Sequence, residues 1–335
     1  MCKKILITGA AGFIGFNFIK ECLKKNIKVF AVDALKYSAN TNEIKKLSKN
    51  RNFFFYKLNI NNKKKIFSIL KKNKILNIVN FAAETHVDNS IQNPKYFFEN
   101  NCIFFLDFLS AVKKFYDLLH FDVKKKFRFI HISTDEIYGS LGVSGKAFVE
   151  TSPIKPNNPY SASKASSELI LRGFSKTFFL PYIITNCSNN YGNYQNDEKF
   201  IPTVFRSALK NKKIPIYGNG KNIRDWIYVV DHCKAILKII SKGKNFEKYN
   251  IGANSEISNF HLAILICKIL DKKRPLSNKN SYKNLISHVP DRLGHDFRYS
   301  VNSRKLKKIG WNSSLSLSKG LLKIADYYIE RYSQS

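Results

Sequence analysis

An acidic pair follows an apolar stretch near the middle of this sequence. Residues 127–132 have the composition of a buried strand, and Thr134, Asp135 and Glu136 come directly after them. Two adjacent carboxyl groups can divide acid and base work when their surroundings hold them in different protonation states. The alternative is that this tripeptide only caps the segment that follows.

A tyrosine and a lysine form the second reactive group. Tyr160 and Lys164 are four residues apart, which places both on one face of a helix. An ammonium beside a phenol favours the phenolate, so a tyrosine with an ordinary pKa of about 10 can act as a base. The alternative is a solvated helix pair, because this spacing often arises by chance. An acid, a base and an activated tyrosine together indicate an oxidoreductase that also eliminates a group.

Apolar runs alternate with helical patterns in the first half of the chain. This alternation predicts an α/β fold, a doubly wound parallel sheet of the Rossmann type with helices on both faces. In such a sheet the ligand crevice lies at the carboxyl ends of the strands, so the acidic pair should face a cofactor. The expected strands are residues 4–8, 28–32, 53–56, 75–81, 127–132 and 178–185, and the expected helices include residues 62–72 and 94–119.

A glycine loop follows the first expected strand. Gly9, Gly12 and Gly15 open a helix, with Phe13 and Ile14 between the last two glycines. Such a loop lets a dinucleotide pyrophosphate approach the backbone at a helix N-terminus. Asp33 ends the second strand, where a carboxylate can bind ribose hydroxyls and repel a 2′-phosphate, which favours NAD over NADP. The alternative for Asp33 is an ordinary turn or cap residue.

The pattern changes after about residue 190. Short segments and turn residues lead to a late helix near residues 260–270. We therefore expect an NAD-binding domain over residues 1–190 and a smaller, mainly substrate-binding lobe over residues 191–335. Some late segments, such as residues 225–230, could return to the first domain.

The composition excludes several classes of protein. The chain has 335 residues and a formal charge of +33, but its lysines are spread along its whole length. We therefore do not expect nucleic-acid binding, although the positive field would favour an anionic nucleotide substrate. The scattered cysteines form no metal or disulfide pattern, so we expect no metal. No apolar run is long enough to span a membrane, and the apolar stretch at the start is too short for a signal peptide, so we expect a cytoplasmic protein.

Several strings make the sequence similar to a known family. The glycine loop and the Tyr160/Lys164 pair resemble the extended short-chain dehydrogenase/reductase superfamily. Longer strings resemble the dTDP-glucose 4,6-dehydratase family, and they run from residue 5 to about residue 300. The string Thr134–Glu136 distinguishes this family from the sugar-nucleotide epimerases of the same superfamily, which generally lack the paired acids at this place. These longer strings are residues 82–88, 131–139, 186–192, 198–199, 223–226 and 291–296.

The resemblance implies a reaction with tightly bound NAD. Tyr160, helped by Lys164, takes the proton of the sugar 4-hydroxyl while C4 is oxidised. Glu136 then takes the C5 proton, and Asp135, kept protonated, gives a proton to the leaving C6 hydroxyl. Hydride return to C6 completes a 4-keto-6-deoxy sugar, and Thr134 would bond the 4-oxygen.

The resemblance also implies binding residues and an assembly. The family forms homodimers through two helices, here residues 94–119 and the Tyr160 helix, so we expect a homodimer. The implied substrate-binding residues are Thr85, His86, Asn189, Lys199, Phe200, Arg224, Asn259, Arg292 and His295. The implied cofactor-binding residues are Gly9, Gly12, Phe13, Ile14, Gly15, Asp33, Asn59, Ile60, Ala82, Ala83, Asn100, Tyr160, Lys164 and Asn190. For Arg224 the alternative is an ion pair with Asp225, and for His295 an ordinary loop position.

Some positions depart from the family pattern. Asn59 replaces an aspartate beside the expected adenine, Asn89 replaces an arginine, and Asn193 and Asp197 replace prolines. Phe104 and Phe105 stand where small residues are usual. None of these touches the acid, the base or the tyrosine, but they bear on affinity and substrate preference. A dehydratase, epimerase or decarboxylase acting on a UDP-, CDP- or GDP-linked sugar, and a non-catalytic nucleotide- or RNA-binding protein, remain as alternatives.

Overall fold

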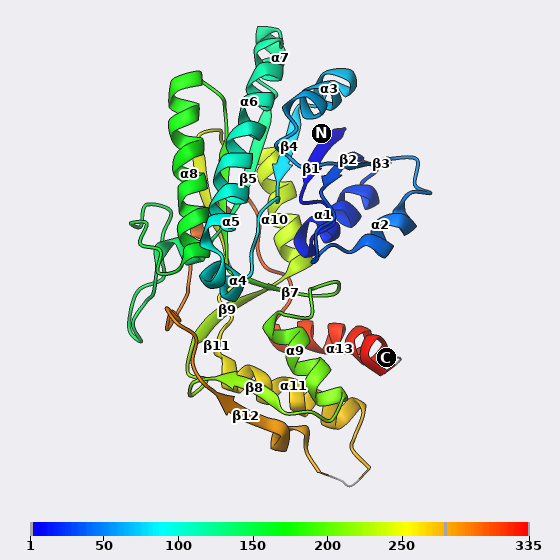
Figure 1. The fold of residues 1–335 in the computed structure, drawn as a ribbon, viewed down its shortest axis with the longest axis vertical. Helices are drawn as coiled ribbons and strands as arrows, with labels where there is room; N and C mark the ends of the chain where they lie inside the picture. Colours follow the sequence, from blue (N-terminus) through cyan, green and yellow to red (C-terminus); the bar gives the residue numbers. More distant parts are fainter. Residues whose placement is uncertain (1–2, 278–279, 334–335) are drawn as a thin grey trace.

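A parallel sheet forms the centre of the molecule. The computed structural model describes residues 3–277 and 280–333. Its seven-stranded sheet has the order β10-β6-β5-β4-β1-β2-β3, with every pairing parallel (Figure 1). The strands are β1 Lys4–Thr8, β2 Lys28–Asp33, β3 Phe53–Lys57, β4 Asn77–Asn80, β5 Arg128–Thr134, β6 Ile183–Cys187 and β10 Glu247–Ile251. The predicted fold class is confirmed.

Helices cover both faces of this sheet. Alternate residues of β1 point to opposite sides: Ile5 and Ile7 join one apolar core, while Leu6 joins the other. The first core is closed by α1 (Phe13–Lys24), α2 (Thr41–Leu47), α10 (Val229–Lys242) and α12 (Arg304–Lys308). The second is closed by α3 (Lys63–Asn73), α6 (Phe104–Asp117) and α8 (Pro159–Phe178).

The expected helix over residues 94–119 contains a π-helical turn. α5 (Pro94–Phe98) continues into η1 (Glu99–Ile103) and then into α6. Such a turn often marks a functional site, because it displaces side chains from the regular helical positions. Here it carries Asn100 into the site described below. It also carries Asn101, whose side chain bonds the backbone nitrogen and oxygen of Glu84 at 2.8 and 3.1 Å.

Two expected strands differ in the structure. The strand expected over residues 178–185 begins only at Ile183, because α8 runs to Phe178 and Phe179 then adopts a left-handed conformation with φ of 56°. The segment suggested as returning to the first domain, residues 225–230, lies mostly in β9 (Ile223–Tyr228), which pairs outside the central sheet, but its Ile227 and Val229 join the first core. The chain then continues in that domain through α10 and β10, and β10 pairs with β6.

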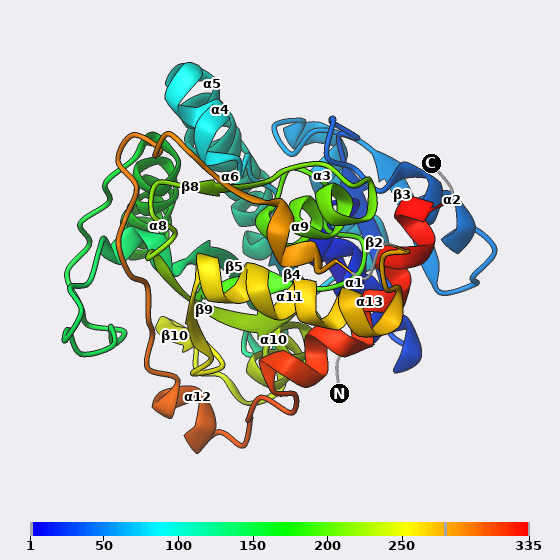
Figure 2. The same cartoon turned by 90° about the horizontal axis from the view of Figure 1, so that it is seen from below.

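A smaller lobe lies beyond the carboxyl ends of the strands. It holds a sheet of order β11-β9-β7 and a second sheet of β12 and β8. α9, α11 and α13 pack side by side around a third apolar core (Figures 1 and 2). These elements are β7 Asn189–Tyr191, α9 Phe200–Leu209, β8 Ile214–Tyr217, β11 Glu256–Ser258, α11 Asn259–Lys273, β12 Ile286–Val289 and α13 Leu317–Ser333.

The remaining short helices connect these layers. They are α4 Val87–Gln92, α7 Phe121–Lys124, η2 Asp135–Tyr138 and η3 Tyr282–Leu285. Within residues 3–277 and 280–333, no helix is both long and apolar enough to cross a membrane.

Candidate active site

Two neighbouring cavities open at the carboxyl edge of the central sheet. The first has a volume of about 320 Å³, and its wall includes each of the residues expected to bind the cofactor, together with Thr134, Asp135 and Glu136. The second has a volume of about 270 Å³, and its wall includes each of the residues expected to bind the substrate. Glu136, Asn189 and Lys199 line both cavities. The residues predicted from the sequence are thus brought together, although their roles stay predictions.

The glycine loop shapes the floor of the first cavity. Gly9 has φ of 62°, and a Cβ there would lie 2.6 Å from the backbone nitrogen of Ala82. A Cβ at Gly15 would lie 2.2 Å from the Gly9 oxygen, so the start of α1 packs directly on the loop. Gly12 is the N-cap of α1, and it has no side chain that could bond the free N–H groups of that first turn. These groups suit a pyrophosphate.

Asp33 is held in place at the end of β2. Its two carboxylate oxygens accept hydrogen bonds from the backbone nitrogens of Ala11 and Leu35, at 2.9 and 2.7 Å. Burial raises the pKa of this carboxyl, and the two backbone hydrogen bonds oppose that rise. Asp33 is therefore fixed beside the glycine loop, with Asn59 and Ile60 on the same wall. This arrangement fits an adenosine ribose and its base.

The acidic pair lies on a short 3-10 helix at the end of β5. Thr134 is its N-cap, and the Thr134 hydroxyl accepts a hydrogen bond from the backbone nitrogen of Glu136 at 3.3 Å. The capping alternative is therefore correct for Thr134 alone. Asp135 is only 1% exposed, and no hydrogen bond is formed by its Oδ2 atom. A carboxyl this deeply buried is easier to keep protonated than ionised.

The surroundings of Asp135 and Glu136 shift the pKa values of their carboxyl groups to different extents. Burial raises the pKa of Asp135 far above its ordinary value, and the negative charges of Glu136 and Asp225 add to that rise. Burial also raises the pKa of Glu136, but Arg224 and Lys199 oppose it. Glu136 thus gives up its proton more readily than Asp135. This asymmetry fits an acid at Asp135 and a base at Glu136.

Tyr160 and Lys164 are both buried at the start of α8, so the solvated-pair alternative is wrong. Lys164 Nζ donates a hydrogen bond to the backbone oxygen of Ile132 at 2.8 Å, and burial lowers the pKa of Lys164 to about 8. Burial and the charge of Glu136 raise the pKa of Tyr160 far above its ordinary value, opposite to the expected direction. The protein alone therefore does not activate the phenol.

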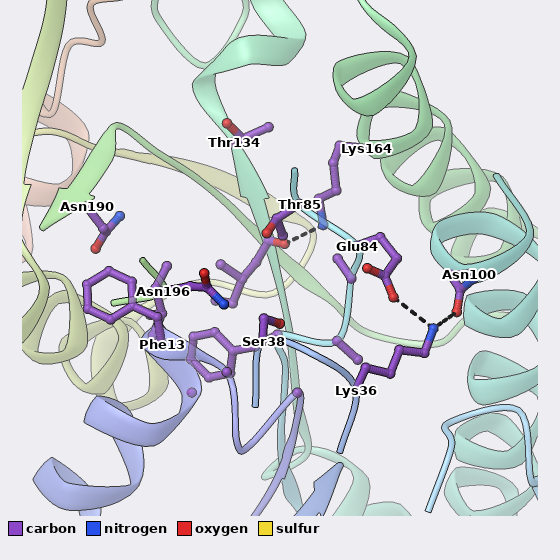
Figure 3. A pocket seen from close by; sticks show the side chains of 18 of the residues that line it. Phe13, Lys36, Ser38, Glu84, Thr85, Asn100, Thr134, Lys164, Asn190 and Asn196 are labelled. Carbon is purple, nitrogen blue, oxygen red and sulfur yellow. Dashed lines mark hydrogen bonds and ion pairs between the residues drawn. The ribbon is translucent and has the colours of Figure 1, made fainter. Parts of the chain in front are cut away.

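The cofactor cavity also shows how these groups lie together. Thr134, Thr85 and Lys164 lie on one side of the cavity, and Phe13 and Asn190 on another (Figure 3). Within the described ranges, no group of three His, Cys, Asp or Glu side chains could hold a metal ion.

Cationic side chains line the second cavity. Arg224 stacks on Tyr299, with its guanidinium carbon 4.3 Å from the ring centroid, and donates hydrogen bonds to the backbone oxygens of Ile223, Phe297 and Asp296. The Asp225 carboxylate instead accepts bonds from the backbone nitrogens of residues 253 and 255. The alternative of an Arg224–Asp225 ion pair is therefore wrong, and Arg224 is rigidly positioned.

Three further basic side chains surround the same space. Arg292 pairs with Asp88 at 2.6 Å, and His295 Nδ1 lies 2.6 Å from Asp291 Oδ1, while burial lowers the pKa of His295 below its ordinary value. Lys199 Nζ donates a hydrogen bond to the backbone oxygen of Thr85 at 2.9 Å, which joins the lobe to the loop after β4. An anionic ligand such as a diphosphate matches Arg224, Arg292 and Lys199 in this wall.

Some wall residues were not predicted. Glu84, Asp88, Asp296 and Glu198 belong to or adjoin strings already recognised in the sequence, so those strings held the missing signal. Tyr299, which supports Arg224, lies outside them. Lys36 had only its position near Asp33 to indicate it.

The departures from the family pattern have structural partners. Asp197 pairs with Arg331 at 2.8 Å and accepts a hydrogen bond from the Tyr332 hydroxyl at 2.5 Å. The Asn193 backbone oxygen accepts a bond from Asn17 at 3.1 Å. Contacts with α13 and α1 therefore hold the loop before α9, where prolines would otherwise stiffen it.

Known proteins share this sequence and this fold. A dTDP-glucose 4,6-dehydratase from Xanthomonas campestris is 43% identical over 325 residues, covering 97% of this chain and 92% of that protein. A dTDP-glucose 4,6-dehydratase from Bacillus anthracis, solved with NAD, has a TM-score of 0.86 and 38% identity, covering 99% of this chain and 98% of the other. One from Streptomyces venezuelae, solved with NAD and TYD bound, has a TM-score of 0.89 and 32% identity, covering 99% and 98%.

A broader family is matched as well. The family described as GDP-mannose 4,6 dehydratase matches residues 6–324. This match covers both cavities and nearly all of the described chain. The chain therefore belongs to the nucleotide-sugar 4,6-dehydratases of this family, together with the dTDP-glucose 4,6-dehydratases.

Proposed function

We propose that this protein converts dTDP-glucose into dTDP-4-keto-6-deoxyglucose with a tightly held NAD. One observation carries the proposal: Glu136 lines both cavities, so the acidic pair lies where the cofactor cavity meets the substrate cavity. A base at this junction can reach a sugar whose C4 faces Tyr160. The relatives named above share this activity by name.

In this proposal each reactive side chain has a defined role in the oxidation at C4. NAD, when bound, supplies a hydride acceptor and donor and a positive charge beside Tyr160. Tyr160 removes the proton of the 4-hydroxyl as C4 becomes a ketone, and the phenolate is favoured by the Lys164 ammonium together with the positive charge of NAD, since the protein alone does not activate the phenol. Thr134 holds the 4-oxygen by a hydrogen bond.

The acidic pair then carries out the elimination. A ketone at C4 acidifies the C5 proton, so a carboxylate of modest basicity such as Glu136 removes it. Asp135, which burial keeps protonated, gives its proton to the C6 hydroxyl, and water leaves. When hydride returns to C6, Glu136 gives its proton back to C5, which completes the 4-keto-6-deoxy sugar.

The base of the nucleotide is tested directly. The purified protein is incubated with dTDP-, UDP-, CDP- and GDP-glucose, and the alkali-induced absorbance of a 4-keto-6-deoxy product is measured. We expect product at the highest rate with dTDP-glucose. Product only with another nucleotide would leave a 4,6-dehydratase of different specificity, and no product with any of them would overturn the enzyme assignment.

We also propose that two chains pair through the helices that leave apolar side chains exposed. Ile103, Leu106 and Leu169 on η1, α6 and α8 are 57%, 41% and 54% exposed. α6 and α8 lie side by side at one end of the molecule (Figure 1), and a second chain would cover the apolar side chains that these helices leave exposed. Light scattering should give twice 38.7 kDa, and a monomeric mass would contradict the pairing.

A further inference from the structure

An ammonium group in the wall of the first cavity has all its donors occupied. Lys36 Nζ lies 2.8 Å from Glu84 Oε1, 2.6 Å from the Tyr96 hydroxyl and 2.6 Å from Asn100 Oδ1. A lysine has three donor hydrogens, so each partner takes one. Figure 3 shows Lys36 reaching across to Glu84 and Asn100 at the edge of the cavity.

The partners of Lys36 come from the opposite side of the glycine loop. Lys36 follows β2, whereas Glu84 follows β4, and Tyr96 and Asn100 lie on α5 and η1. In the sheet, β1 lies between β4 and β2, and the glycine loop follows β1. The Lys36 contacts therefore join the two loops that flank the glycine loop, which is where a dinucleotide would lie.

Burial strengthens this connection. The Glu84 side chain is only 9% exposed and that of Lys36 is 33% exposed, so water screens the pair weakly. The Tyr96 hydroxyl also donates to Glu84 Oε1 at 3.1 Å, which closes a small hydrogen-bonded ring. Charge-assisted bonds of this kind are stronger than neutral ones.

The loop that carries Lys36 is tied down on its other side as well. Asn40 donates hydrogen bonds to the backbone oxygens of Ala11 and Tyr194, at 3.1 and 3.2 Å. Tyr37 lies 3.4 Å from Glu198, on the loop before α9. Lys36 is the point at which this loop reaches the β4 side of the cavity.

We propose that Lys36 is a latch for the cofactor: its bonds to Glu84, Tyr96 and Asn100 hold the β2 and β4 loops together and slow the release of NAD. Lys36 is a positioning residue, because it acts through these three partners. The proposal deepens the proposed function and rests on the assignment of the first cavity to NAD. A latch suits an enzyme whose cofactor ends each turnover in its starting state and has no need to leave.

The test is the rate at which purified protein releases bound NAD into an excess of a fluorescent NAD analogue. Lys36→Met keeps the aliphatic stem and removes the three donors, and we expect release to become about tenfold faster. Glu84→Gln should also speed release. The double variant should release NAD no faster than the quicker single variant, because both changes open the same latch.

Lys46→Met is the matched control. Lys46 pairs with Glu43 at 2.6 Å on α2, but neither residue lines the cavity, so release should stay at the wild-type rate. Release from Lys36→Met at the control rate would overturn the latch. The latch would also be overturned if Lys36→Met released NAD faster while Glu84→Gln released it at the wild-type rate, since Lys36 would then act without its partner.

Two measurements keep the outcomes separate. Thermal unfolding of the NAD-free variants shows whether each is folded, and Tyr96→Phe, which removes one hydroxyl, replaces Lys36→Met in the test if that variant does not fold. Wild-type protein that carries and binds no NAD would refute the proposed function itself. If the wild-type protein binds NAD but releases it at the same rate as every latch variant, the latch alone is refuted.

Discussion

The side-chain amide of Asn186 joins Glu168 to the turn that carries Asp135 and Glu136: it donates one hydrogen bond to Glu168 Oε1 at 2.6 Å and another to the backbone oxygen of Thr134 at 3.0 Å. Glu168 is fully buried on α8, four residues after Lys164. Its other oxygen lies 2.7 Å from Nζ of Lys248, on β10. A late segment of the chain thus supports the start of the acidic helix η2.

Replacing Glu168 with Gln should destabilise the fold. The change leaves the largely buried Lys248 ammonium without its counter-charge, and breaking such a pair costs about 3 kcal/mol. Urea unfolding measures this free energy. Asp122→Asn breaks an exposed pair with Lys125 and should cost less than about 0.5 kcal/mol. A Glu168→Gln cost no larger than this control would contradict the argument.

Replacing Glu136 with Gln should separate oxidation from elimination. An amide cannot take the C5 proton, so exchange of C5 hydrogen with solvent should fall by roughly 10²–10⁴-fold. Oxidation at C4 uses Tyr160 and should continue, which the absorbance of the bound cofactor reports. Asp135→Asn is the partner variant, in which C5 exchange should persist while water loss slows. Glu136→Gln that neither oxidises the sugar nor exchanges C5 hydrogen would show that the roles are wrongly divided.

The Lys164 ammonium should set an alkaline limit to activity. Burial lowers the pKa of Lys164 to about 8, so the charge is present below that pH and is lost as the pH rises through it. Turnover should therefore fall about tenfold for each pH unit above the limit. A Lys164→Arg variant stays charged throughout, so its residual activity should lack this limb. If the turnover of both proteins falls in the same way at high pH, the fall belongs to the titration of another group.

The carboxyl-edge site was predictable because its parts lie at strand ends. Gly9 follows β1, Asp33 ends β2, and Thr134 ends β5, so a parallel sheet brings them together whatever the loops do. The residues of the second cavity were predicted only from the sequence strings shared with the family. The positions of Arg224 and His295 depend on the topology of the smaller lobe, and the hydrophobic periodicity of the sequence does not reveal that topology.

The end of α8 shows why some boundaries were not predictable. Residues 178–180 form an apolar run that resembles the start of a strand. In the structure Phe178 packs against Phe174 one turn earlier in α8, with ring centroids 4.6 Å apart, so an i,i+4 contact within the helix favours its extension to Phe178. The Lys36 contacts were not predictable for a different reason: they join residues 48 and 64 positions apart, which no local pattern connects.

A buried histidine should make the fold sensitive to acid. Burial lowers the pKa of His232 to about 3, and its Nδ1 atom lies 2.8 Å from Asn190 Oδ1. The unfolded chain takes up a proton near pH 6.5, whereas the folded protein does not. The contribution of neutral His232 to the free energy of unfolding is therefore fully present above about pH 6.5 and is lost as the pH falls toward 3. Between pH 7 and pH 5 this histidine should remove about 2 kcal/mol.

Urea unfolding at pH 7 and pH 5 tests this link between His232 and the cavity wall. His232→Asn keeps a donor for Asn190 and cannot titrate, so its unfolding free energy should change less between the two pH values than that of the wild type. His120 is exposed at 79% of its side chain, and His120→Asn should behave like the wild type. An equal loss in His232→Asn would place the acid sensitivity elsewhere, because an asparagine cannot titrate and so cannot produce the difference.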